Sequence, residues 1–346
     1  MPKICTFGNA LSAYKKARKC KRYRSDVLQF EAKRELNLIR AMEDLENGTY
    51  EAGKYFVFKV YEPKERLIMA LPFYDRVIQH MIVNIIEPIF CRRFIKHSYA
   101  CQKDKGVHKA SNTLARWLYN LQVKQGKKVY AIKADIQHYF QSIDHEILKK
   151  EIRRYIGDKD LIKILDYIID NNGIYPDGVG IPVGNLTSQV FANVYLNILD
   201  QYIKHELGVR YYVRYMDDFV ILGEDIEELK EILAKIEVFV QQRLHLTLNT
   251  KTTILSAKNG IDFAGYRHFA TFRILRKAAT RRIRKTLNAF QNGEIDEEIF
   301  DRSMQSRLGH IIHADTYNLV KSIEEEVRAL KSRVQNIGTV ECFTLS

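Results

Sequence analysis

The chain has 346 residues, 46% of them hydrophobic, which is enough for one large domain or two to three smaller ones. Its net charge of +13 favours nucleic acid as a partner, with a membrane surface as the second choice. No stretch approaches the roughly 18 apolar residues of a membrane span, and residues 1–10 lack the apolar core of a signal sequence. Five cysteines without a C-x-x-C pair argue against a zinc site and a disulfide framework, so we expect a cytoplasmic protein.

The first part of the chain is predicted to be mainly helical. Residues 26–46 carry apolar side chains at helical spacing among charges, and residues 75–94 read as a mostly buried helix. Between them, residues 55–60 alternate like a strand. Trp117, further on, is expected in the core.

From residue 129 onward, the sequence carries clearer signals for strands and for helix ends. Residues 129–136 predict a strand that ends in an acid, Asp135. Asp144 is expected to cap the helix that follows, and Thr187 or Ser188 to cap a long helix through Leu199.

Tyr215-Met216-Asp217-Asp218 is the most informative segment. It lies between two apolar runs, residues 211–213 and 219–222, which predicts a β-hairpin with adjacent carboxylates at its tip. Aspartate is common in turns, but like charges held together repel each other. A divalent cation between the two carboxylates would explain the pair.

The remaining elements complete an α+β pattern. A helix is expected from Ile226 to Val240, short strands around Ile254 and Phe263, and basic helices after Lys277. This order suits an antiparallel sheet with helices on one face. Asp135 and the hairpin tip would then meet at one end of the sheet.

Three carboxylates without histidine or cysteine nearby favour a hard cation, Mg²⁺ or Mn²⁺. Two such ions about 4 Å apart assist in-line phosphoryl displacement. A basic protein with this site is a nucleotidyl transferase or a nuclease.

Positive charge gathers in two runs, residues 15–24 and residues 273–285, each with seven basic residues. Such runs are often solvated faces, but in so basic a chain phosphate-binding surfaces are at least as good an interpretation. The second run contains Arg273, Arg276, Lys277, Arg281, Arg282, Arg284 and Lys285.

In these motifs and their order, the chain resembles reverse transcriptases over about residues 55–270. The blocks appear in the family's order: residues 62–68, 75–77, 98–103, 133–140, 180–184, 215–218, 248–252 and 263–266. The resemblance implies a right-hand polymerase fold. Its expected parts are a basic N-terminal extension at 1–54, fingers at 55–128, a palm at 129–270 with a fingers insertion at about 146–180, and a helical basic thumb at 271–346.

The resemblance also implies roles for single residues. Asp135 and Asp217 would bridge two Mg²⁺ ions, for which Mn²⁺ can substitute, with Asp218 as an outer ligand and the carbonyl of Ile136 completing one shell. Lys251 would protonate pyrophosphate, with a plain surface lysine as the alternative. The expected nucleotide-binding residues are Lys64, Arg66, Phe140, Val183, Gly184 and Gln189.

Phe140 would exclude a 2′-hydroxyl and so select dNTPs, and the alternative is a plain core residue. Lys64 and Arg66 would hold the triphosphate, or form a solvated face. His310 and His313 are three residues apart on an expected helix, and we interpret them as structural rather than as metal ligands.

A narrower resemblance concerns Gly184-Asn185-Leu186-Thr187-Ser188-Gln189, which is similar to the reverse transcriptases of diversity-generating retroelements. It implies error-prone copying of a template-repeat RNA at adenines in a bacterial or phage-infected cell, and an oligomeric accessory variability protein as partner besides RNA–cDNA duplex and dNTPs. The alternatives are another stand-alone prokaryotic reverse transcriptase, defence-associated or group II intron-like, and a non-catalytic RNA-binding protein on a polymerase palm.

Overall fold

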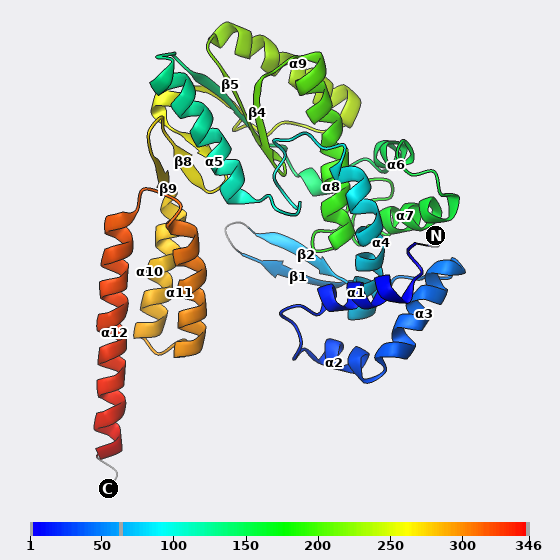
Figure 1. Cartoon of the computed structure of the whole chain (residues 1–346), viewed down its shortest axis with the longest axis horizontal. Helices are drawn as coiled ribbons and strands as arrows, with labels where there is room; N and C mark the ends of the chain where they lie inside the picture. Colours follow the sequence, from blue (N-terminus) through cyan, green and yellow to red (C-terminus); the bar gives the residue numbers. More distant parts are fainter. Residues whose placement is uncertain (1–2, 62–64, 344–346) are drawn as a thin grey trace. The chain divides into compact units, whose positions relative to one another are not determined.

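The computed structural model describes residues 3–61 and 65–343, and of the side chains only those up to residue 332 (Figure 1). The chain divides into two compact units. The first unit comprises Met1–Gly106, Ile132–Leu222 and Ile226–Ile254, and the second comprises Val107–Ala131, Gly223–Asp225 and Leu255–Ser346.

The first unit begins with helices α1 (Phe7–Ala17), α2 (Ser25–Ala32) and α3 (Arg34–Glu46), which pack against α4 (Phe73–Cys91). Helix α1 was not predicted from the sequence, and the single helix expected at 26–46 is wrong. The chain breaks at Lys33, whose φ of −128° and ψ of 41° are not helical. The helix expected at 75–94 is confirmed as α4.

A hairpin of strands β1 (Phe56–Val60) and β2 (Arg66–Ala70) precedes α4. The strands are antiparallel, with Phe58 opposite Ile68, and the strand expected at 55–60 is confirmed as β1. Residues 62–64, between these strands in the sequence, lie outside the described residues.

The central sheet has the strand order β4-β5-β3-β6. Its strands are β3 (Tyr130–Ala134), β4 (Tyr211–Tyr215), β5 (Asp218–Gly223) and β6 (Thr253–Ser256). Strands β4 and β5 form the predicted antiparallel hairpin, with Tyr215 opposite Asp218. Because β5 neighbours β3, the expected placement of Asp135 beside the hairpin is confirmed.

Four further helices complete the first unit: α6 (His145–Arg153), α7 (Lys159–Asp170), α8 (Leu186–Gln201) and α9 (Ile226–Leu244). The predicted cap of α6 is confirmed, since Asp144 accepts a hydrogen bond from the Ile147 amide at 3.0 Å. The predicted cap of α8 is wrong. The helix begins at Leu186, and Thr187 and Ser188 are buried within it.

The second unit combines α5 (Val107–Leu118) with a sheet of β7 (Ile261–Phe263), β8 (Tyr266–His268) and β9 (Arg273–Leu275) in that order. Helices α10 (Lys277–Gln291), α11 (Glu297–Ile311) and α12 (Tyr317–Phe343) follow (Figure 1). Their core includes stacked Phe290 and Phe300 rings with centroids 4.1 Å apart. Trp117 is 8% exposed, as expected of a core residue.

In the described part of the chain, no helix combines the length and the apolar character that a membrane crossing requires.

His268 makes the stability of the second unit dependent on pH. Its ring is fully buried, and burial above all lowers its pKa to about 4. Nε2 lies 3.3 Å from the Phe263 carbonyl oxygen and so carries the proton of the neutral ring. Nδ1 has no hydrogen-bond partner among the described residues, so a second proton there would create a buried charge without an acceptor.

The folded His268 therefore binds a proton less readily than the unfolded one, whose pKa is near 6.5. Stability contributed by the neutral ring is present above about pH 6.5 and is lost as the pH falls towards 4, by up to about 3 kcal/mol. We expect His268→Gln to flatten the pH dependence of the urea midpoint in this window, and exposed His205→Gln to leave it unchanged. Equal slopes for wild type and His268→Gln would contradict this account.

Candidate active site

The two-residue turn between β4 and β5 consists of Met216 and Asp217. Met216 has a φ of 56°, in the left-handed region that few residues other than glycine adopt. Asp217 therefore stands on a turn whose conformation must be held by its surroundings. Asp218 is the first residue of β5 and not part of the tip itself.

Asp217 lies close to Asp135, which directly follows β3. Burial and, second, the negative charge of Asp135 raise the pKa of Asp217 to about 6, and Arg66 acts in the opposite direction. Two carboxylates that repel each other in a partly buried place cost stability. Their proximity indicates a site that a cation completes.

Asp218 forms an ion pair with Lys133. Lys133 Nζ lies 3.5 Å from Asp218 Oδ1, and both side chains are about one quarter exposed. Lys133 stands two residues before Asp135, so the alternation of β3 places both on one face of the sheet. That spacing was visible in the sequence, but the partner was not. The predicted set of three acids thus consists of a close pair and a third acid paired with lysine.

The segment before β6 supports Asp135. The Asn249 amide donates to the Asp135 carbonyl at 2.7 Å, and Asn249 Nδ2 lies 3.4 Å from Asp135 Oδ2. Ile136 forms a β-bridge with Leu248. Lys251 is exposed in the following turn, with its amide donating to Asn249 Oδ1 at 3.0 Å. Asn249 was not among the residues expected at the site, although it stands in the same sequence block as Lys251.

The segment with Val183 and Gly184 lies against β2. The Met69 amide donates to the Val183 carbonyl at 2.8 Å, and Gly184 has a φ of +125°. A Cβ at Gly184 would lie 2.8 Å from the Met69 carbonyl oxygen. Only glycine permits this approach without strain. Arg66 begins β2, whereas Lys64 lies outside the described residues.

The two remaining nucleotide-binding residues that we expected are Phe140 and Gln189. The Phe140 carbonyl accepts a hydrogen bond from the Ile181 amide at 2.9 Å, which joins this residue to the glycine-containing segment. The Phe140 side chain is half-buried. Gln189 is exposed on α8.

The donor set of the acidic pair fits a hard divalent cation. Asp135 and Asp217 offer only oxygen ligands, which Mg²⁺ and Mn²⁺ prefer. Among the described side chains, those of residues 3–61 and 65–332, however, no three His, Cys, Asp or Glu residues gather as ligands of one ion. Mg²⁺ commonly binds through one or two carboxylates plus substrate phosphates and water, so a two-carboxylate site is consistent with it.

The basic run at 273–285 belongs to the second unit. The Arg273 side chain forms hydrogen bonds within the protein, because it donates to Ser111 Oγ at 2.7 Å and to Asn112 Oδ1 at 2.6 Å. Arg284 pairs with Glu326. Arg276 is exposed before α10, and Arg282 is half-buried. Lys277, Arg281 and Lys285 are exposed at four-residue spacing and line one groove on α10.

His310 and His313 lie near other aromatic groups of the second unit. The His313 ring stacks on His108 with centroids 3.7 Å apart, and Tyr266 Oη donates to the His310 carbonyl at 2.8 Å. Burial lowers the pKa of His310. These contacts agree with a packing role.

Comparison of the sequence with known proteins identifies the family of this chain. Residues 59–268 match the sequence profile of the reverse transcriptase family, the RNA-dependent DNA polymerases. Protein YkfC of Escherichia coli K12 is 26% identical over 284 residues, which cover 70% of this chain and 73% of YkfC. The group II intron-encoded protein LtrA of Lactococcus lactis is 22% identical over 331 residues, 74% of this chain and 53% of LtrA.

Among solved structures, telomerase from Candida albicans in complex with a TWJ fragment of telomeric RNA has a similar fold. The TM-score is 0.50 at 11% identity, over 82% of this chain and 60% of the telomerase chain. The fold is therefore that of a right-hand polymerase with antiparallel sheets. The chain belongs to the reverse transcriptase family, whose members are RNA-directed DNA polymerases that use divalent metal ions.

Proposed function

We propose that this protein copies an RNA template into DNA at the Asp135–Asp217 pair. The observation that carries the proposal is the approach of these two carboxylates at the ends of neighbouring strands, with the positive charge of Arg66 near enough to Asp217 to lower its pKa. We also propose that residues 55–128 act as fingers, 129–270 as palm and 271–346 as thumb, after the extension at 1–54.

In this proposal Asp135 and Asp217 hold the metal ions, for which we propose two Mg²⁺. Bound Mg²⁺ would stabilise the charge that develops on the transferred phosphoryl group. Arg66 adds positive charge for the triphosphate, Phe140 selects the sugar, and Lys251 supplies a proton to pyrophosphate. Asn249 keeps Asp135 in place through its two contacts.

Primer extension tests the proposal. The purified chain should extend a DNA primer on a heteropolymeric RNA with dNTPs and Mg²⁺, and should use rNTPs far less well. Phe140→Ala serves as a matched variant, because it should admit rNTPs while dNTP use continues. A chain that binds the duplex but adds no nucleotide would support the RNA-binding alternative.

The exposed cations of α10 should bind phosphates. We expect the triple variant Lys277→Gln, Arg281→Gln and Lys285→Gln to weaken binding to RNA–DNA duplex, because each cation that binds a phosphate releases counterions. The slope of log affinity against log salt should fall by about 2 to 3, at ~0.7 to 0.9 for each phosphate that is no longer neutralised. Fluorescence anisotropy at several salt concentrations measures it.

A charge-matched control neutralises Lys163, Lys235 and Arg243, which are exposed elsewhere. It lowers the net charge equally, so any decrease of slope beyond the control belongs to the α10 surface. Weaker binding with an unchanged salt slope in the α10 variant would mean that these residues contact protein, such as an accessory partner.

We further propose that the enzyme belongs to a diversity-generating retroelement and copies a template-repeat RNA with errors at adenines. The segment from Gly184 to Gln189 supports this, as does Val183, which has no polar side-chain atom to contact a nucleotide. An oligomeric accessory variability protein is the partner that this assignment implies. A group II intron-like enzyme is the second candidate, favoured by the similarity to LtrA over 74% of the chain.

Val183→Gln tests the source of the errors. Glutamine at this position can hydrogen-bond the incoming nucleotide or the template, which adds about 1 to 3 kcal/mol of discrimination against misaligned pairs. We expect errors opposite template adenine to fall roughly ten- to hundredfold, more than opposite other bases. An active variant whose sequenced cDNA shows the wild-type adenine error frequency would refute this role, and Val183 would then only fill space.

A further inference from the structure

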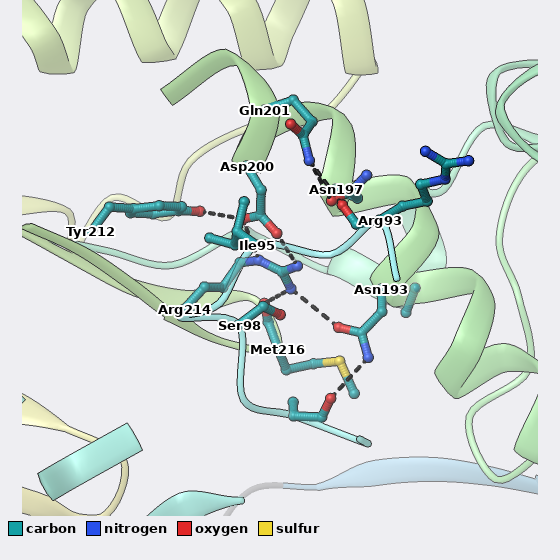
Figure 2. A network of polar contacts seen from close by, with 12 residues as sticks. Arg93, Ile95, Ser98, Asn193, Asn197, Asp200, Gln201, Tyr212, Arg214 and Met216 are labelled. Atoms are coloured by element: carbon teal, nitrogen blue, oxygen red, sulfur yellow. Dashed lines mark hydrogen bonds and ion pairs between the residues drawn. The ribbon is translucent and has the colours of Figure 1, made fainter. Parts of the chain in front are cut away.

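Arg214, near the end of β4, is a fully buried arginine. Its guanidinium pairs with Asp200 of α8, which is also fully buried, through Nε–Oδ1 at 2.7 Å and Nη2–Oδ2 at 2.5 Å (Figure 2). Burying a charge pair is costly unless its remaining donors and acceptors are satisfied. Here Tyr212 Oη donates to Asp200 Oδ1 at 2.7 Å, and Arg214 Nη1 lies 3.3 Å from Asn193 Oδ1.

The same guanidinium reaches the catalytic turn. Arg214 Nη1 donates to the Met216 carbonyl at 2.8 Å (Figure 2). That carbonyl belongs to the peptide bond between Met216 and Asp217. Because a peptide bond is planar, holding its oxygen also fixes the direction in which the chain enters Asp217.

The turn requires such a restraint. The positive φ of Met216 costs a residue with a side chain roughly 1–2 kcal/mol. The main chain of Arg214 is held as well, since its amide donates to the His97 carbonyl and its carbonyl accepts from the Tyr99 amide, both at 3.0 Å. Arg214 therefore links Asp200 of α8 and the segment at residues 97–99 to the strained peptide beside Asp217.

We propose that Arg214 is a positioning residue that fixes the Met216–Asp217 peptide from α8 and thereby keeps the Asp217 carboxylate beside Asp135. The inference rests on the proposed function, because it concerns the same acidic pair. The guanidinium is required for its shape. Its planar set of five donors reaches Asp200 and the Met216 carbonyl at once, whereas a lysine ammonium concentrates its donors on one nitrogen.

Three variants separate positioning from packing. Arg214→Lys keeps the buried charge but loses the second arm of the fork. The triple variant Arg214→Met, Asp200→Leu and Tyr212→Phe removes the polar network without leaving an unpaired charge, a kind of exchange that is often neutral for stability. The control, Tyr195→Phe, removes a buried hydrogen bond of α8 to the Leu244 carbonyl and does not touch the turn.

Each protein is measured for its thermal midpoint, for kcat and KM of single-nucleotide addition on an RNA template, and for Mn²⁺ binding by electron paramagnetic resonance. We expect the triple variant and Arg214→Lys to lose roughly 100-fold in kcat, the loss expected from a displacement of about 1 Å, with KM for dNTP little changed. Mn²⁺ binding should weaken roughly tenfold in both, a free-energy change of about 1.4 kcal/mol. Tyr195→Phe should lose stability only.

Wild-type kcat and Mn²⁺ affinity in Arg214→Lys would overturn the proposal, whether or not the triple variant folds. A folded triple variant with the activity of Tyr195→Phe would overturn it as well, because the network would then serve packing alone. Failure of the proposed function looks different. In that case wild type adds no nucleotide on RNA, while the Mn²⁺ comparison still decides whether Arg214 positions the acidic pair.

Discussion

Asp217→Asn is expected to abolish nucleotide addition while the protein remains folded and binds RNA. The substitution removes a charged ligand, and metal activation contributes several kcal/mol to the transition state, so the rate should fall roughly 1,000-fold or more. Asp135→Asn should behave alike. Primer extension on RNA with Mg²⁺, followed to low product levels, measures the loss.

The same substitution should leave the thermal midpoint unchanged or raise it. Burial and Asp135 raise the pKa of Asp217 to about 6, so its ionised form is destabilising at neutral pH. Asparagine removes this repulsion. Asp177→Asn, at a turn aspartate that is exposed, is the control and should alter neither property. Residual extension within tenfold of wild type in Asp217→Asn would show that the acidic pair is not the catalytic site.

Gly184→Ala should also cause a large loss of activity. The methyl group would meet the Met69 carbonyl oxygen at 2.8 Å, and a φ of +125° adds strain of about 1–3 kcal/mol for a residue with a side chain. The segment must therefore move away from β2. A shift of about 1 Å at the proposed nucleotide site is expected to reduce kcat roughly 100-fold.

Gly157→Ala is the matched control, because nothing lies within 4 Å of its added methyl group. Urea midpoints and single-turnover rates of both variants separate the loss of stability from the loss of activity. A Gly184→Ala enzyme with wild-type rates would show that contact with β2 does not position this segment.

Local sequence signals predicted much of the fold around the site. Two apolar runs on either side of a short turn predicted the β4–β5 hairpin, and a third run predicted the strand β3 that ends before the acid Asp135. The two misplaced helix boundaries had weaker signals. At Lys33 the apolar periodicity continues across the break, and at Thr187 a good capping residue lies inside the helix, where tertiary packing buries it.

The contacts that hold the site together were not predictable in the same way. Lys133 and Asp218 are 85 positions apart by their numbers, and Asn249 reaches Asp135 across 114 positions. The Arg214–Asp200 pair joins a strand to a helix through side chains that a sequence presents only as one more basic and one more acidic residue. Such pairs depend on the strand order and on the packing of α8. Neither can be inferred from the short-range spacing of apolar residues in the sequence.

Sequencing of the cDNA made by the wild-type enzyme on one heteropolymeric RNA tests both RNA-directed polymerisation and the expected errors at adenines. The reaction contains Mg²⁺, a DNA primer and all four dNTPs. We expect full-length cDNA whose substitutions lie mainly opposite template adenines. Absence of cDNA would contradict RNA-directed polymerisation by this chain, and errors spread evenly over the four template bases would contradict its assignment to a diversity-generating retroelement.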